Sequence, residues 1–295
     1  MTDLSSPYSY ISGATSPGVT LQGTLLNHTV TANSIHAHVI DYLSVLSITN
    51  SSGANTLPNI LGETNSLYNE GRPGLSKPFG AALWGVDFNL YAASQNITRV
   101  HMHMGTGYRY QAWQPIDTSS GLYTPTTIGT KAPYYGSIAV AAILGNVSAR
   151  DTRVANLPLQ QTDEAAYAVY GPGNAGVVPS RIAVINMLQY NYTALANGTG
   201  LAYPAPRPER TYTFQLPPAL CAGTTTAVRR LNANGSDAVT GVTWDGYSYN
   251  WELEQGRPVL LSNVTRDEVL AIAGDGSASV SVPASGVAVL DLACR

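Results

Sequence analysis

The sequence is poor in charged residues, and above all in lysine. Asp, Glu, Lys and Arg together make up 11% of the 295 residues, the formal net charge is -3, and the only lysines are Lys77 and Lys131. Nucleic-acid binding depends on clustered basic side chains that neutralise phosphate groups, and the sequence contains no such basic patch. We therefore expect no nucleic-acid partner.

The sequence also lacks an apolar leader and has few cysteines. Met1 is followed by Thr-Asp-Leu-Ser-Ser-Pro, without the apolar run of a targeting segment, and we expect no association with a membrane. The two cysteines, Cys221 and Cys294, both lie in the C-terminal part. In a secreted protein an even count favours one disulfide, here tying the last strand to a neighbour. Two buried thiols are the alternative.

Asn-x-Ser/Thr triplets, the acceptor motif for N-linked glycans, are by contrast abundant. Their number is about twice what chance predicts for this composition, and together with the low charge they indicate a secreted glycoprotein whose signal peptide is not part of this chain. The acceptor residues are Asn27, Asn50, Asn96, Asn146, Asn191, Asn197, Asn234 and Asn263.

A short apolar run at 57–61 stops abruptly at Gly62-Glu63 and a polar loop. In a parallel β/α barrel the strand interior is packed with apolar side chains, and the residues at its C-terminal tip face the substrate cleft. A carboxylate in this place is typical of a catalytic acid. The alternative is an ordinary exposed loop carboxylate.

Helical and extended patterns alternate on both sides of this run. Apolar residues recur at helical spacing over 78–94, and 132–145 has Pro near its start and Gly at its end. A short strand over 97–104 lies between them, and a strand end at 8–14 precedes a helical stretch over 30–46. Strand and helix in alternation predict parallel pairing, hence three βα units. A barrel closes with eight, so we expect about five units upstream of this chain.

Beyond about residue 146 the pattern changes to short alternating runs separated by turn residues. This spacing predicts an antiparallel β-sandwich. The fold class is therefore α/β followed by all-β, with a partial (β/α)8 barrel at 1–145 and the β-sandwich at 146–295. The expected strands are 165–170, 181–188, 211–216, 224–231, 258–261, 278–282 and 287–292.

The residues around Glu63 resemble a known enzyme family. The run Leu61-Gly62-Glu63-Thr64-Asn65-Ser66, Tyr68 five residues beyond the Glu, and the 105–110 segment after the next strand are similar to glycoside hydrolase family 79. That family holds β-glucuronidases and heparanases, which are (β/α)8 barrels with an appended β-sandwich. The resemblance runs from about Tyr8 to Arg295, and the chain resembles the secreted fungal β-glucuronidases more than it resembles heparanase.

The resemblance implies retaining hydrolysis by two carboxyl groups, a nucleophile and a general acid/base. Glu63 matches the nucleophile. The acid/base of the family is the Glu of an Asn-Glu pair on the fourth barrel strand, upstream of this chain. Asn69-Glu70 is the only such pair here, but it follows the nucleophile in the same loop and cannot be that strand tip. We therefore expect the chain alone to be inactive.

The resemblance also implies a glucuronate subsite. Tyr68 and Tyr110 match tyrosines that line it. The 105–110 segment offers successive backbone N–H groups with guanidinium and phenol side chains nearby, so Gly107, Arg109 and Tyr110 are expected carboxylate contacts. Tyr10, at the tip of the upstream strand, is a further candidate. The alternative for Arg109 is a structural ion pair, since its side chain can point away from the sugar.

His101 and His103 form a His-x-His pair on the strand over 97–104, which places both imidazoles on one face. A metal site would need a third clustered ligand, and none is evident. We interpret the pair as core or helix-facing histidines and expect neither a metal nor a cofactor.

The expected function is that of a retaining β-glucuronidase-like glycoside hydrolase acting on terminal glucuronic acid of glycans, as a monomer. The alternative from another class is a noncatalytic carbohydrate-binding or structural β-sandwich protein. Within the enzyme class, a heparanase-like endo-glucuronidase is a further alternative. The scarcity of Lys and Arg argues against it, since a broad basic cleft would favour such an enzyme.

Overall fold

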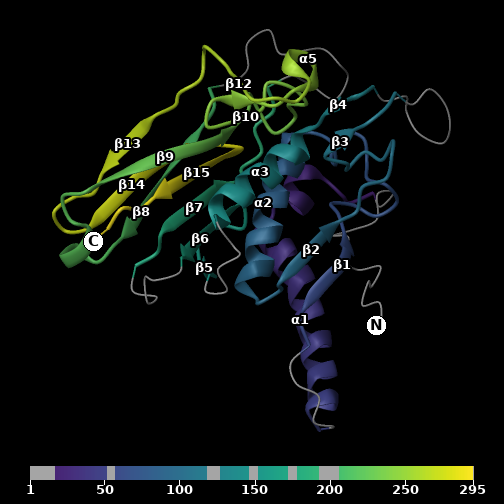
Figure 1. Cartoon of the computed structure of the whole chain (residues 1–295), viewed down its shortest axis with the longest axis horizontal. Coiled ribbons are helices and arrows are strands. Elements are labelled where there is room, and N and C mark those ends of the chain that lie inside the picture. Colours follow the sequence, from purple (N-terminus) through teal and green to yellow (C-terminus); the bar gives the residue numbers. More distant parts are fainter. Residues whose placement is uncertain are drawn as a thin grey trace.

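The computed structural model describes residues 17–51, 57–117, 127–145, 152–171, 178–192 and 206–294. Figure 1 shows a helix-rich N-terminal part beside a strand-rich C-terminal part, so the chain mixes helices and sheets with a β-rich C-terminal domain. The expected strand at 8–14, and with it Tyr10, lies outside the described residues.

The N-terminal part contains the predicted alternation of helix and strand. A π-helical turn, Leu21–Leu25, leads into α1 (His28–Ser51), and the elements that follow are β1 (Ile60–Thr64), α2 (Phe79–Ser94), β2 (Arg99–Met102) and α3 (Ala132–Leu144). The strands β1 and β2 pair in parallel. The three expected helices and the parallel pairing are therefore confirmed.

Proline and glycine set the limits of these helices. Helix α2 begins directly after the extended residue Pro78, and α3 carries Pro133 in its first turn. Helix α3 ends at Leu144, and the next residue, Gly145, has a φ of 69° and donates its N–H to the carbonyl of Ala141. A side chain at this φ would be strained, so glycine suits this end of the helix.

A short hairpin stands between β2 and α3. Its strands are β3 (Trp113–Gln114) and β4 (Gly129–Thr130), with Trp113 opposite Thr130. The sequence pattern did not predict this hairpin, because two-residue strands carry no periodicity.

The C-terminal part is built on one large antiparallel sheet. Its strands pair in the order β12-β11-β10-β9-β15-β7-β6-β5, and β13 also pairs with β9. The bounds are β5 (Arg153–Leu157), β6 (Glu164–Tyr170), β7 (Arg181–Asn186), β9 (Thr225–Asn232), β10 (Thr243–Trp244), β11 (Tyr247–Ser248), β12 (Val259–Leu260), β13 (Glu268–Ala271) and β15 (Gly286–Asp291).

A second, two-stranded sheet covers part of the first. Strands β8 (Glu209–Gln215) and β14 (Ser277–Pro283) pair antiparallel along their whole length. The short helices α4 (Pro218–Cys221) and α5 (Trp251–Glu254) lie in the connections. Cys221 at the end of α4 is disulfide-bonded to Cys294, which lies just beyond β15, across a sequence separation of 73 residues.

The central strands of the large sheet are buried on both faces. On β7, Ile182 and Val184 pack in a core with β8 and β14, whereas Ala183 and Ile185 pack in a second core with α2 and α3. Successive residues of β15 alternate between the two cores in the same way. The helix-side core is therefore continuous across residue 145, where the sequence had suggested a domain boundary.

The helices pack closely on each other, and a buried polar cluster joins them to the large sheet. A Cβ at Gly136 on α3 would lie 2.6 Å from the carbonyl oxygen of Ala82 on α2, so glycine lets the two backbones approach. The carboxylate of Asp87 on α2 is fully buried and accepts a 2.6 Å hydrogen bond from the hydroxyl of Tyr167 on β6. His28 at the start of α1 contacts the same carboxylate oxygen through Nδ1 at 2.9 Å.

The seven strands predicted for the C-terminal part are all present. The sequence pattern missed β5, β10, β11 and β13, which are short or lie toward the edges of the large sheet. None of the described helices combines the length and apolarity that crossing a membrane requires.

Candidate active site

Glu63 lies in an irregularity of the parallel strand pair. Leu61 is opposite Val100 and Thr64 is opposite Met102, so β1 has one residue more than β2 over this interval. An extra residue of this kind makes a β-bulge, which bends the strand and re-aims its side chains. Glu63 occupies the bulge, and 48% of its side chain is accessible. The bulge thus presents the carboxylate at the C-terminal end of the strand.

His103, just beyond β2, lies beside this carboxylate. Its backbone N–H donates to the carbonyl of Thr64 at 2.8 Å, which continues the pairing of the two strands. Its ring Nδ1 lies 3.5 Å from Glu63 Oε1 and 2.8 Å from the hydroxyl of Tyr110. The Tyr110 hydroxyl can donate to the neutral ring, and a protonated ring can pair with Glu63. The interpretation of the two histidines as core or helix-facing is therefore wrong for His103, which lies beside Glu63. It is also wrong for His101, which is exposed.

Asn65 connects the loops that follow the two strands. It is buried, and its side-chain amide donates to the carbonyl of His103 at 2.9 Å and more weakly to that of Tyr110 at 3.5 Å. Its carboxamide oxygen accepts from the N–H of Ser66 at 2.7 Å. These bonds fix the position of the Glu63 bulge relative to the loop that carries His103.

Several backbone N–H groups of the 105–110 segment are used inside the protein. Gly107 donates to Gln114 Oε1 at 3.1 Å, and Arg109 donates to the carbonyl of Glu70 at 2.9 Å. Tyr108 donates to the carbonyl at the start of the segment at 3.0 Å. The expectation that these three N–H groups are directed at a sugar carboxylate is therefore wrong. The assignment of Gly107 and Arg109 to the substrate site stays a prediction. Atoms other than their backbone N–H groups would have to contact the sugar.

The predicted aromatic residues take different places. Tyr110 is buried against His103, with only 3% of its surface accessible, whereas Tyr68 is 55% exposed on the loop after β1. Tyr108, which the sequence analysis did not single out, packs edge-on against both His103 and Tyr110. A Cβ at Gly105 would clash with the Tyr108 ring, so glycine lets this ring fold back over the loop.

The Asn69-Glu70 pair belongs to the structure of the loop after β1. Asn69, Glu70 and Gly71 all have positive φ, at 57°, 65° and 83°. The turn brings the carbonyl of Glu70 to the N–H of Arg109, while the Arg109 guanidinium makes a long contact of 3.5 Å with the carbonyl of Gly71. The pair thus ties the loop after β1 to the loop after β2.

A buried lysine supports the loop after β2. Lys131, just before α3, is only 5% exposed, and burial together with the charge of Lys77 lowers its pKa to about 8. With its amide oriented to satisfy both neighbours, Gln111 accepts from Lys131 Nζ at 2.5 Å and donates to Gln114 Oε1 at 3.1 Å. Sequence reasoning missed this network, because nothing in the local pattern marks a lysine that will be buried.

Among the residues that the structure describes, no three His, Cys, Asp or Glu side chains gather as metal ligands would. The arrangement around Glu63 suits a different chemistry. An accessible carboxylate lies at a strand end, beside an imidazole and a phenol that fix its surroundings. Such a carboxylate can act as a nucleophile or a general base.

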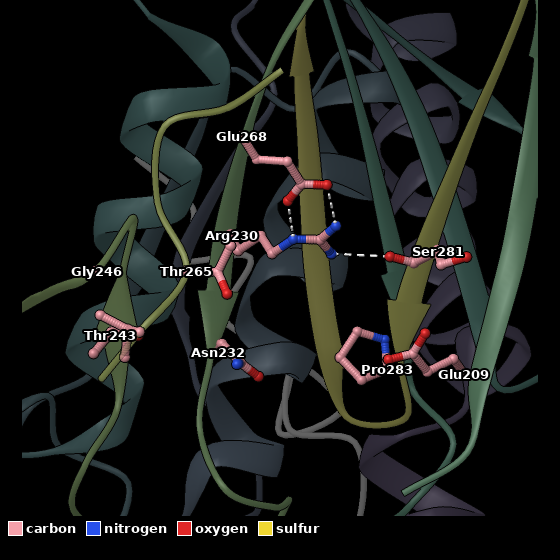
Figure 2. A pocket seen from close by; sticks show the side chains of 10 residues that line it. Glu209, Arg230, Asn232, Thr243, Gly246, Thr265, Glu268, Ser281 and Pro283 are labelled. Atoms are coloured by element: carbon pink, nitrogen blue, oxygen red, sulfur yellow. Dashed lines mark hydrogen bonds and ion pairs between the residues drawn. The ribbon is translucent and has the colours of Figure 1, made fainter. Parts of the chain in front are cut away.

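The C-terminal domain carries a separate pocket of about 380 Å³. Figure 2 shows Arg230 held by the two carboxylate oxygens of Glu268 at 2.6 and 2.7 Å and by the carbonyl of Ser281 at 3.0 Å. The guanidinium joins β9, β13 and β14, and Glu209 adds a further negative charge to the lining. These charges disfavour an anionic sugar, so the pocket is a poorer candidate for a glucuronate site than the surroundings of Glu63.

Comparison with known proteins identifies relatives of this chain. Residues 166–289 match the glycosyl hydrolase family 79 C-terminal beta domain. The chain is 53% identical over 291 residues to a beta-glucuronidase of Aspergillus niger, covering 98% of this chain and 51% of that protein. It is 50% identical over 301 residues to a beta-glucuronidase of Neurospora crassa, covering 96% of this chain and 52% of that protein.

A solved structure has the same fold over nearly the whole chain. The 4-O-alpha-L-rhamnosyl-beta-D-glucuronidase of Fusarium oxysporum superposes with a TM-score of 0.72 at 22% identity, covering 96% of this chain and 52% of that one. The chain thus spans about half the length of the curated relatives it matches. On this evidence residues 166–289 are a glycosyl hydrolase family 79 C-terminal beta domain, and the chain is related over nearly its whole length to proteins named beta-glucuronidase.

Proposed function

We propose that this chain carries the nucleophile of a retaining β-glucuronidase that removes terminal glucuronic acid from glycans. The observation that carries the proposal is the position of Glu63, an accessible carboxylate in a bulge at the C-terminal end of β1, 3.5 Å from His103 Nδ1. The relatives named beta-glucuronidase, at 53% and 50% identity, support the substrate class.

We assign β1, β2 and the helices around them to a (β/α)8 barrel. Two parallel strands with a helix after each, and polar residues at the strand ends, are what the last units of such a barrel require. This chain matches about half the length of the relatives, and the other half of the relatives is long enough to contain the remaining βα units of a barrel.

Retaining hydrolysis needs a second carboxyl group about 5 Å from the nucleophile. We assign this general acid/base to the part of the relatives that this chain does not span. In the proposed mechanism Glu63 attacks the anomeric carbon while the acid protonates the leaving oxygen. The covalent glucuronyl-enzyme is then hydrolysed by a water that the same group, now a base, activates. The candidates for contacting the sugar remain Tyr68, Gly107, Arg109 and Tyr110, together with Tyr10, which lies outside the described residues.

Trapping of the covalent intermediate tests this proposal. A 2-deoxy-2-fluoro-β-glucuronide with a good leaving group should label a full-length protein that contains this sequence, and peptide mass spectrometry should place the label on Glu63. Glu63→Ala should lower turnover of an aryl β-glucuronide by roughly tenfold or more, with partial rescue by azide. Labelling of another residue would show that Glu63 is not the nucleophile.

We further propose that the protein is secreted and glycosylated. The Cys221–Cys294 disulfide suits an oxidising compartment. Asn27 is half-buried; the side chain of Asn50, and all of Asn146 and Asn197, lie outside the described part. The other predicted acceptors are exposed, namely Asn96, Asn191, Asn234 and Asn263. A mobility shift on treatment with an N-glycosidase, with deamidation mapped by mass spectrometry, tests this proposal.

A further inference from the structure

A groove lined by aromatic side chains lies where the β3–β4 hairpin meets α5 of the C-terminal domain. Its volume is about 380 Å³, and Trp113, Tyr134 and Trp251 are among its lining residues. Figure 1 draws β3, β4 and α5 together at one end of the molecule. The groove is therefore built by both halves of the chain, and its size is within the range of small-ligand sites.

The two indole rings are more accessible than large apolar side chains usually are. Trp113 is 48% exposed and Trp251 is 38% exposed. Leaving such rings in water forgoes much of the free energy that their burial would contribute. Exposed aromatic groups gathered around one concavity are typical of a binding surface.

The aromatic walls are fixed before any ligand arrives. Tyr134 packs edge-on against Trp113 at 6.0 Å and against Tyr249 at 6.3 Å between ring centroids. The neighbouring Tyr135 hydroxyl accepts from the N–H of Tyr249 at 2.7 Å and donates to the side chain of Asn250, directly before Trp251, at 2.9 Å. Both tryptophans are thus attached to one braced aromatic cluster, which lowers the entropy lost on binding.

The polar lining of the groove is uncharged. Gln255 and Thr130 supply amide and hydroxyl groups, whereas the amide of Gln114 is buried and bonded to Gly107 and Ile116. All the lining residues within the described part of the chain are neutral. A carboxylate lies only at the rim, where Glu252 Oε1 is 3.3 Å from the position of a Cβ on Gly129. A flat apolar face combined with amides and hydroxyls matches a pyranose ring, which has C–H groups on its faces and hydroxyls around its edge. A lining without a cation disfavours a uronate.

The groove shares Trp113 with a cavity that is lined by residues supporting the candidate active site. Trp113 follows Tyr110 by three residues in the loop after β2, and it also lines a second cavity of about 230 Å³ together with Asn65 and Tyr110. Asn65 and Tyr110 are the residues that hold His103 beside Glu63. A glycan bound at both places would have to reach from Glu63 to the groove, and Trp113 is the residue that connects their surroundings.

We propose that this groove is a second sugar-binding subsite, which holds an uncharged pyranose unit of the glycan that bears the terminal glucuronic acid. The identity of the glycan rests on the proposed function, whereas binding of a neutral sugar to the groove does not depend on catalysis. Trp113 and Trp251 stack on the ring faces, and Gln255 and Thr130 bind the hydroxyls.

Titration with neutral oligosaccharides tests the subsite directly. The chain is titrated with β-linked tetrasaccharides of glucose, galactose and xylose, and tryptophan fluorescence and calorimetry are recorded. At least one should bind saturably and change the fluorescence, and Trp113→Ala or Trp251→Ala should weaken binding about tenfold or more. Tyr192→Ala is the matched control, because it removes an aromatic side chain that is 44% exposed outside the groove, and it should leave binding unchanged.

Absence of saturable binding for all three sugars, or binding that neither tryptophan substitution weakens, would overturn the subsite. Circular dichroism checks the fold of each variant, and Trp113→Leu and Trp251→Leu, which keep apolar bulk without an indole ring, replace any alanine variant that fails to fold.

A kinetic measurement connects the subsite to the proposed reaction. In a full-length protein containing this sequence, both substitutions should raise KM for a glucuronate-capped oligosaccharide far more than KM for an aryl glucuronide, whose leaving group is too short to fill the groove. Equal effects on the two substrates would overturn the role of the groove in holding the glycan. Failure of the fluoroglucuronide labelling would remove the catalytic assignment of Glu63, while the titration alone decides neutral-sugar binding.

Discussion

Asp87→Ala should destabilise the chain strongly, because Asp87 is a fully buried carboxylate shared by three elements. Its Oδ1 accepts from the Tyr167 hydroxyl at 2.6 Å and contacts His28 Nδ1 at 2.9 Å. Hydrogen bonds to a charged group contribute about 1.5–3 kcal/mol each. Removal of one member of a buried charged pair costs about 3–5 kcal/mol, because the partners are left unsatisfied. Against a total stability of about 5–15 kcal/mol, this change should approach the limit of folding.

The same cluster makes stability depend on pH. Burial lowers the pKa of His28, but the hydrogen bond and the charge of Asp87 together outweigh this effect and raise the pKa above its ordinary value of 6.5. The folded chain therefore holds the proton more tightly than the unfolded chain. The stabilising contribution is complete below about pH 6.5 and is lost as the pH rises through the higher folded-state pKa. It should be absent in Asp87→Asn, whose side chain carries no charge.

Urea unfolding followed by circular dichroism at pH 5.5, 7 and 8.5 provides the measurement, because this series runs from about one unit below to about two units above the ordinary pKa of histidine. Asp87→Ala should lower the free energy of unfolding by about 3–5 kcal/mol, and Tyr167→Phe by about 1–3 kcal/mol. Asp41→Ala, which removes an exposed carboxylate from α1, is the control and should change stability by less than about 0.5 kcal/mol. A cost below about 1 kcal/mol for Asp87→Ala would refute the reasoning, because the cluster would then not hold α1, α2 and β6 together.

Gly136→Ala should lower the free energy of unfolding by about 1–3 kcal/mol, because its Cβ would meet the backbone of Ala82. Gly85→Ala, with open space around the new Cβ, should leave this free energy unchanged or raise it by up to about 1 kcal/mol, and paired urea titrations compare the two variants. The pKa of Lys131 is lowered from an ordinary 10.5 to about 8, so between these pH values the unfolded chain binds more protons than the folded chain. Wild-type stability should therefore increase as the pH rises from about 8 to 10.5. Melting curves recorded over this pH range should show the increase for the wild type and not for Lys131→Met. The whole chain should show one calorimetric transition, and a fragment of residues 152–294 should melt about 10 °C or more below it; an equally stable fragment would show that the helix-side core contributes little.

The sequence pattern was sufficient to predict the helices and strands that are long enough to show a repeating or continuous apolar pattern. Helices α2 and α3, of 16 and 13 residues, both have a proline at their start, α3 is followed by Gly145, and both were predicted closely. Strands β6, β7 and β15 were recognised from their apolar runs, although the reason for those runs is visible only in the structure. Their alternate residues enter two different cores, so these strands have no polar face.

The site was predictable only where the position of a residue in the local pattern is informative. Glu63 at the end of an apolar run could be identified, but its exposure depends on a bulge whose extra residue is defined by pairing with β2, on the far side of α2 in the sequence. His103 was misread because a histidine on a short strand has no periodic signature of its own. The supporting contacts of Asn65 and Lys131 join segments far apart in the chain. Local pattern carries no information on such contacts.

The placement of the large sheet bears on what the C-terminal domain contributes to the candidate site. One face of the sheet packs on α2 and α3, whose preceding loops carry the residues around Glu63 and His103. The braced cluster of Tyr134, Tyr135 and Tyr249 joins the start of α3 to the segment that carries α5. Movement of the domain relative to β1 and β2 would therefore disturb both the helix packing and the aromatic groove. We therefore expect the C-terminal domain to move as one body with α2 and α3, and so to support the candidate active site while it forms part of the aromatic groove.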